Sequence, residues 1–337
     1  MQRLAALQRA EIKVAGKTVE VPAVNVGNQT VIITGRFLRR ASVKDEDWLE
    51  TEAVSSPAAF TTMLQEAPLC PDIFSFAQRV PDVVPRWTYP MEWDNVAAIP
   101  LANGFENWWE NRVPQETRKN TRRAAKRGVT TQIVQLNDDV IRGLMEINNE
   151  SPVVQGKRSR HYGKDFETVK RDYSSFPDRS DYIAAYCGEE FVGLVWLVGM
   201  GQVVTICQLC TKTKHYDKRP ANALMARTVE FCCEQGYLYL TYGKYLYGKG
   251  TESSLMEFKR RLGFEKVMVP RYYIPLTVRG RLAIRMRLHL GLTNLLPRRL
   301  ILTLLQLRSR YYRMRYSRRA GLKRAASPEP NSLERAR

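Results

Sequence analysis

A loop and the helix after it, residues 212–223, combine positive charge with small side chains. The segment reads KTKHYDKRPANA and follows the apolar run VVTICQLCT. A helix that begins just after a strand presents free backbone N–H groups and the positive end of its dipole, which suits a phosphate. Pro220 fits a first helical turn, and Ala221 and Ala223 let a ligand approach the backbone closely. These residues alone leave two interpretations open, an ordinary basic loop or a phosphate-binding site.

A second candidate stretch is SLMEFKRRLGFE, residues 254–265. Leu255, Phe258 and Leu262 recur at helical spacing, which predicts a helix face packed in the core. Gly263 follows them, and helices commonly end at a glycine. Lys259 and Arg261 lie elsewhere on this helix. They either form a solvated face or place positive charge where negative charge develops in a reaction.

Short, strongly patterned elements surround these two stretches. The first three predicted strands are separated by tight turns and should be antiparallel, whereas a helix between the third and fourth implies a parallel pair. The expected fold class is therefore α/β (α+β), a mixed sheet flanked by helices. The predicted strands are 182–187, 191–198, 203–211, 237–243, 264–269 and 271–276, and the predicted helices are 221–235 and 254–262.

A basic helix precedes this block. Six of the twelve residues in 117–128 are basic: Arg118, Lys119, Arg122, Arg123, Lys126 and Arg127. Such a run is either a solvated helix face or a site for a polyanion. Upstream of it, short β-rich runs alternate with proline-rich connections.

The positive charge is concentrated near the C-terminus. The formal net charge is +19, and the segment 271–324 holds fifteen Lys or Arg and no Asp or Glu. Residues 277–326 interleave Leu, Ile and Met with Arg at a helical period, which predicts a basic amphipathic arm, and 327–337 have the composition of a disordered tail. The arm would pack on the body, lie on an anionic membrane surface through 277–319, or hold nucleic acid such as tRNA, the weaker alternative.

The six cysteines do not predict a metal site or a disulfide framework. Their spacings are irregular, and no secretory signal precedes them, so a reducing, cytoplasmic location is expected. In the one zinc-like spacing, Cys207 and Cys210 are expected on opposite faces of a strand. The uncharged run 191–210 contains Gly199-Met200-Gly201 and many β-branched residues, so two buried strands explain it better than a membrane span.

The order of elements over residues 180–276 resembles the acyl-CoA-binding core of the GNAT acyltransferases. The resemblance implies that acetyl-CoA or another acyl-CoA is the co-substrate, with no metal. It also implies that the diphosphate rests on the loop and helix start. That loop is usually glycine-rich, Q/R-x-x-G-x-G/A, whereas this chain has K-R-P-A-N-A. The implied cofactor-binding residues are Lys218, Arg219, Ala221, Asn222 and Ala223.

Two motifs indicate which branch of the GNAT acyltransferases the chain resembles. Many GNAT enzymes end the last helix with Y-x-K-L-G-F and use that tyrosine as a general acid, but Lys259 stands at its position here. F-K-x-R-L-G is instead similar to the Y-K-x-R-F-G element of the FemAB-like branch, and RKNTRRAAKRGV is similar to the basic helix that ends its first half. The resemblance implies a duplicated fold, with a degenerate GNAT-like half at 1–136 and an acyltransferase domain at 137–276.

An acyl transfer of this kind needs a positioned acceptor, a group that takes its proton, and positive charge near the leaving group. The expected catalytic residues are Lys259 for charge, with Tyr242 and Glu252 for proton transfer. The expected acceptor is an amine or hydroxyl on a small or lipid-linked molecule, such as a cell-envelope sugar or peptide precursor, at the inner face of the membrane. The alternatives are an aminoacyl-tRNA donor, or an inactive module that binds membrane or RNA.

Overall fold

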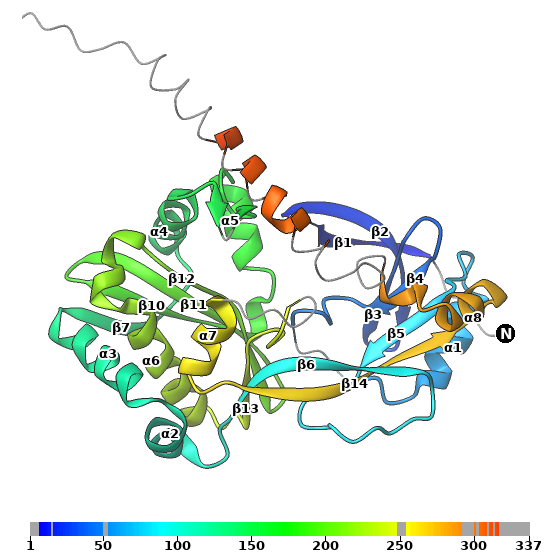
Figure 1. Ribbon diagram of the computed structural model, residues 1–337, viewed down its shortest axis with the longest axis horizontal. Helices are drawn as coiled ribbons and strands as arrows, with labels where there is room; N and C mark the ends of the chain where they lie inside the picture. Colours follow the sequence, from blue (N-terminus) through cyan, green and yellow to red (C-terminus); the bar gives the residue numbers. More distant parts are fainter. Residues whose placement is uncertain are drawn as a thin grey trace, which may run out of the picture.

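A single twelve-stranded sheet runs through the protein (Figure 1). The computed structural model describes residues 7–14, 16–49, 53–154, 156–247, 254–291, 300, 303–308, 310–312 and 314–316. The strand order in the sheet is β1-β2-β3-β4-β5-β14-β6-β13-β12-β11-β10-β7. One part of the sheet holds β1 (Gln8–Val14), β2 (Lys17–Val26), β3 (Gln29–Thr34), β4 (Arg40–Val43), β5 (Ile73–Ala77) and β14 (Glu265–Pro275). The other holds β6 (Met91–Pro100), β13 (Tyr239–Thr241), β12 (Val203–Thr211), β11 (Glu190–Met200), β10 (Ser180–Cys187) and β7 (Val129–Val134).

Helices cover both faces of the sheet, and a small hairpin of β8 (Val153–Val154) and β9 (Lys157–Arg158) lies outside it. The α-helices are α1 (Pro57–Glu66), α2 (Gly104–Asn107), α3 (Gln115–Lys126), α4 (Asp138–Asn149), α5 (Phe166–Tyr173), α6 (Pro220–Glu234), α7 (Ser254–Arg261) and α8 (Val278–Arg285). A π-helical turn, η1 (Trp108–Arg112), and 3-10 turns η2 (Pro177–Arg179), η3 (Thr213–Lys218) and η4 (Leu288–Leu290) complete them.

The central block agrees with the predicted order of elements. β10, β11 and β12 pair antiparallel, and the crossover through α6 makes β13 parallel to β12. The predicted break between strands 264–269 and 271–276 is wrong, because β14 is one continuous strand. Pro270 faces Trp93 of β6, and its carbonyl accepts a hydrogen bond from the Gln78 backbone N–H. Proline removes only a donor, so the strand continues through it.

Strands from distant parts of the sequence alternate in the sheet. β14 pairs with β5 on one side and with β6 on the other, and β7 closes the far edge against β10. One hydrophobic core lies between β2–β5 and α1, a second lies under α3 and α6, and a third lies under α4 and α5. The division at residue 136 stays a prediction, since β6 and β7 pack with elements from the second half.

β12 and β13 diverge near the middle of the sheet. They pair only over Val203–Thr205 and Tyr239–Thr241, after which Tyr242 follows β6 through a hydrogen bond to the Ala97 carbonyl. Beyond Thr205, β12 continues to Thr211 and, within the part of the chain that the structure describes, pairs there with β11 alone. This divergence opens the sheet between two parallel strand ends and leaves one edge of β12 uncovered by β13.

A β-bulge interrupts β12 in the same region. The register shifts between Trp196 and Leu197, so that Gln208 faces the first and Ile206 the second. The extra residue is Cys207, and both Cys207 and Cys210 pack against the core under α4 and α5. The prediction that these two thiols face opposite sides is therefore wrong, because the bulge changes the alternation.

Burial raises the pKa of both thiols, that of Cys210 to about 12. No group of three or more His, Cys, Asp or Glu is placed to hold a metal ion within the described ranges. Over the same ranges, no helix is long and apolar enough to cross a membrane.

Candidate functional site

A cleft of about 1320 Å³ lies where β12 and β13 diverge. Its floor is Gln208–Thr211 of β12 and Tyr242, which follows β13. The start of α6 and the helices α3, α4 and α7 form its walls, together with the β8–β9 hairpin and the loop that leads to His161. A ligand in this cleft would therefore meet a strand edge, a helix start and a ring of loops at once.

The start of α6 opens into the cleft. Arg219 precedes the helix with a left-handed backbone (φ 61°), Pro220 takes the first turn, and no side chain caps the helix. Arg219, Ala221 and Asn222 line the cleft. Neither alanine of the K-R-P-A-N-A segment has a positive φ, so glycine is not needed there for its backbone conformation. The positive end of the helix and one arginine therefore face the cavity.

Two other predicted cofactor-binding residues point elsewhere. The Lys218 ammonium donates to the Cys187 thiol at 2.9 Å, and Ala223 packs against the core under α3 and α6. Neither residue lines the cleft. The structure thus brings three of the five predicted residues together at the cavity.

The basic loop before α6 is tied to the body by carboxylates. Glu190 accepts from the ammonium groups of Lys212 (2.9 Å) and Lys214 (2.6 Å), and it contacts His215 Nε2 at 3.0 Å. These three contacts, from Lys214, Lys212 and His215 in that order, lower the pKa of Glu190 to about 2. Lys212 also binds Glu146. The basic side chains of this loop therefore mainly bind carboxylates of the body and fix the loop, and they contribute less charge to a ligand.

A basic rim surrounds the cleft, and only part of it was expected from the sequence. Arg260 and Arg261 of α7 lie on the rim but share the carboxylate of Glu257. The basic residues that line the cleft are Lys157, Arg158, Arg160, Arg219, Arg260 and Arg261. Three of these six, Lys157, Arg158 and Arg160, lie in the segment 151–161, whose irregular sequence carries no periodic signal.

Lys259 is fully buried in α7 and does not line the cleft. Its ammonium donates to the carbonyls of Tyr242 (2.5 Å) and Lys244 (2.7 Å). It also lies 4.6 Å from the ring centroid of Tyr242 and 5.2 Å from that of Tyr247. Burial lowers the pKa of Lys259 to about 8. The lysine thus fixes the chain that follows β13, including the residue at the cleft floor.

Tyr242 and His161 are titratable side chains of the cleft. Burial raises the pKa of Tyr242 above its ordinary value, so its hydroxyl stays protonated and can donate. Burial, assisted by the charge of Lys164, lowers the pKa of His161 to about 4, so its imidazole is neutral near pH 7 and can accept a hydrogen bond. No motif or period in the sequence marks His161 as a site residue. The predicted Glu252 lies outside the described residues.

The apolar face of α7 has two environments. Leu262 is buried and its carbonyl accepts from Trp108 Nε1 at 3.1 Å, as a core residue would. Leu255 and Phe258 are only half-buried and line the cleft with it. The prediction of a purely core-packed face is corrected, because this face also forms an apolar wall of the cavity.

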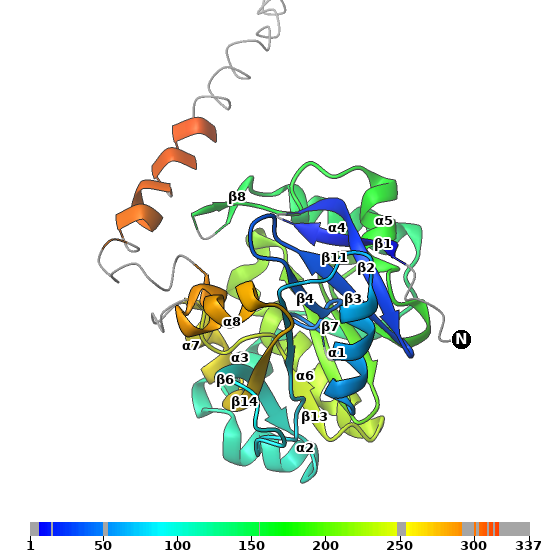
Figure 2. The ribbon, with the colours of Figure 1, turned by 90° about the vertical axis from the view of Figure 1, so that its right-hand side faces the viewer.

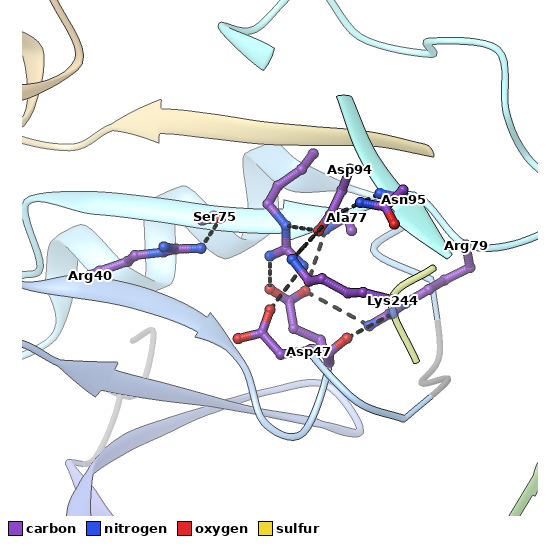
Figure 3. A network of polar contacts seen from close by, with 10 residues as sticks. Arg40, Asp47, Ser75, Ala77, Arg79, Asp94, Asn95 and Lys244 are labelled. Carbon is purple, nitrogen blue, oxygen red and sulfur yellow. Dashed lines mark hydrogen bonds and ion pairs between the residues drawn. The ribbon is translucent and has the colours of Figure 1, made fainter. Parts of the chain in front are cut away.

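A buried ion cluster lies between the two parts of the sheet (Figure 3). The Arg271 guanidinium binds Glu46 at 2.7 Å, Asp47 at 3.0 Å and Asp94 at 3.0 Å. Lys244 completes the cluster through Asp94. Burial opposes ionisation of Asp94, but Arg271 and Lys244 hold its pKa below the ordinary value. Since Lys244 also offers its carbonyl to Lys259, the cluster connects the cleft floor to β6 and β14.

Comparisons with known proteins bear on this geometry. Residues 112–260 match the family model described as "Acetyltransferase (GNAT) domain". The crystal structure of FemX has a TM-score of 0.53 at 10% identity, covering 83% of this chain and 90% of that one. L-PGS from Bacillus licheniformis has a TM-score of 0.51 at 15% identity, covering 77% and 86%.

A third solved structure is the C-terminal domain of a putative lysylphosphatidylglycerol synthetase from Agrobacterium fabrum. Its TM-score is 0.50 at 12% identity, covering 79% of this chain and 87% of that chain. No curated protein matches the sequence. At such identities these structures establish the fold alone. Residues 112–260 are therefore similar to a GNAT domain, and the fold of the chain is similar to those of FemX and L-PGS.

Proposed function

We propose that the chain transfers an acetyl or other acyl group from acyl-CoA to an amine or hydroxyl acceptor. The supporting observation is the opening between β12 and β13, from which the cleft reaches the start of α6. The pantetheine arm carries peptide-like amides, which suit the uncovered edge of β12. The diphosphate would lie at the start of α6 beside Arg219, and the basic rim suits the remaining phosphate.

In this reaction the acceptor lone pair attacks the thioester carbonyl, the C–S bond breaks, and the thiolate takes up a proton. The Tyr242 hydroxyl is the protonated group at the cleft floor and is the proposed donor to the thiolate. The neutral imidazole of His161, which lines the cleft, is proposed to accept a hydrogen bond from the attacking group, whose proton then passes to bulk water. Lys259 acts as a positioning residue, because it binds the Tyr242 carbonyl from outside the cleft.

Calorimetry with CoA and acetyl-CoA tests the donor, and thiol release with amine and hydroxyl acceptors tests the reaction. We expect binding of both ligands and a fall in kcat of about 100-fold for Tyr242→Phe. Tyr239→Phe is the matched control, because Tyr239 lies on β13 three residues before Tyr242, half-buried, but does not line the cleft. Absence of binding at millimolar ligand would exclude acyl-CoA as the donor.

A second candidate is an aminoacyl-tRNA donor. It is supported by α3, which lines the cleft through Thr117 and Asn120 and exposes Lys119, Arg122 and Arg123 to solvent. Retention of tRNA with a steep salt dependence, without CoA binding, would favour this donor. A chain that binds neither donor would be an inactive module.

A further inference from the structure

Helix α8 is fixed to the body by its inner face. The Thr277 hydroxyl accepts from the Gly280 backbone N–H at 3.1 Å and donates to Asp72 Oδ1 at 2.8 Å. Gly280 lies so close to the Asp72 carbonyl that no side chain would fit there. Ala283 is buried beside Tyr273. The orientation of α8 is therefore set by a cap, a close backbone approach and a small core.

The outer face of α8 is apolar and exposed. Val278, Leu282 and Met286 follow one another at four-residue spacing and are 72%, 56% and 55% exposed. Phe37, in the turn between β3 and β4, is 83% exposed, and its carbonyl accepts from Arg279 Nη1 at 3.3 Å. We call Phe37, Val278, Leu282 and Met286 the apolar patch. Large apolar side chains gathered in this way mark an interaction surface.

Positive charge surrounds the apolar patch. Arg281 and Arg285 are exposed beside it on α8, and the Arg36 guanidinium lies 5.9 Å from the Phe37 ring centroid. The sequence from 271 to 324 supplies no carboxylate to neutralise these arginines. The helical turns that the structure describes between 300 and 316 lie clear of the body in Figure 2. Like α8, they combine exposed arginines with exposed apolar residues. Their exposed apolar residues include Leu300, Leu304, Leu307 and Met314.

We infer that the apolar patch and its flanking arginines dock the protein on an anionic phospholipid bilayer. Side chains of this size insert at the level of the upper acyl chains, while arginines beside them meet the phosphate headgroups. α8 has eight residues and packs on the body through Gly280 and Ala283, which leaves its other face free for an interfacial contact. An RNA backbone would use the arginines but would leave the four apolar side chains in water, so a bilayer fits the surface better.

Flotation of the full-length chain with vesicles tests this inference. We expect flotation with phosphatidylcholine vesicles that contain phosphatidylglycerol, and little with phosphatidylcholine alone. Val278→Ser/Leu282→Ser/Met286→Ser and, separately, Arg281→Gln/Arg285→Gln should each lower the partition coefficient about tenfold or more. Phe37→Ser gives a second apolar variant outside the helix, in case the triple variant unfolds α8.

The matched controls lie at the other end of the sheet. Ile133→Ser changes an exposed apolar residue of the edge strand β7, and Arg122→Gln/Arg123→Gln removes the same charge from α3. Both should float as the wild type does. The inference fails if the patch variants float as well as the controls, or if neutral vesicles bind equally. It also fails if the chain binds RNA but no vesicle.

Discussion

At the scale of single residues, Lys259 shows how a charged side chain can serve a site without entering it. In the described part of the chain, its ammonium contacts two backbone carbonyls and two aromatic rings, and no carboxylate. A buried ammonium that makes such contacts is retained only where its hydrogen bonds are complete. The residue therefore joins α7 to the chain after β13, and the position of Tyr242 depends on it.

The lowered pKa of Lys259 has a consequence for stability. Because this pKa is about 8 in the folded chain and its ordinary value is 10.5, the unfolded chain binds more protons between these two values. The free energy of unfolding of the wild type should therefore rise with pH across this window, relative to Lys259→Met, by up to about 3 kcal/mol.

Urea denaturation at pH about 7 and about 10 measures this difference. Lys266→Met is the matched control, since Lys266 is exposed on β14 and this variant, which keeps Lys259, should follow the pH slope of the wild type. Equal pH slopes for the wild type and both variants would mean that the Lys259 ammonium is not desolvated in the folded protein.

At the scale of elements, the start of α6 is the feature on which the proposed donor depends. Asn222→Asp would place a carboxylate in the first turn of α6, facing the cleft. It should raise the KM for acyl-CoA about tenfold and change kcat less than about twofold, because diphosphate binding is shared by ground and transition states. The melting temperature should not fall, since an acid near a helix N-terminus is favourable.

Steady-state kinetics on Asn222→Asp and on Gln132→Glu check this expectation. Gln132 is exposed on the edge strand β7 and receives the same charge change away from the cleft. If both variants keep the wild-type KM, the diphosphate does not bind at the start of α6.

The elements that the sequence predicted well are those with a strong local period. β10, β11, β12 and α6 were predicted because alternation and helical spacing depend on neighbouring residues alone. The bulge at Cys207 depends on the register with β11, and the burial of Lys259 depends on carbonyls 15 and 17 residues away. His161 lies in an irregular loop, so only the folded chain brings it to the cleft. Long-range contacts of this kind leave no periodic trace.

At the scale of the whole molecule, the two parts of the sheet are held together by β14 and by the ion cluster. Arg271 reaches Glu46 after β4 and Asp94 on β6, so a single guanidinium joins segments more than 170 residues from it. The Arg271 side chain is 7% exposed and that of Glu46 is 2% exposed. Charges this deeply buried are stable only when they are paired. The two parts of the sheet can therefore join here only if the ion cluster forms.

Arg271→Met would leave the Glu46 carboxylate buried without its partner, so we expect the free energy of unfolding to fall by about 3–5 kcal/mol. Arg287→Met is the matched control: Arg287 is 69% exposed and binds Glu92 at 3.2 Å, so its loss should change stability by less than about 1 kcal/mol. Adding Glu46→Gln to Arg271→Met should recover part of the loss, because the orphaned charge is then removed. Urea unfolding of the wild type, of Arg271→Met, of Glu46→Gln and of the double variant measures the coupling free energy between the two residues. A double variant no more stable than Arg271→Met alone would show that the loss comes from packing around β14, and that the ion pair does not join the two parts of the sheet.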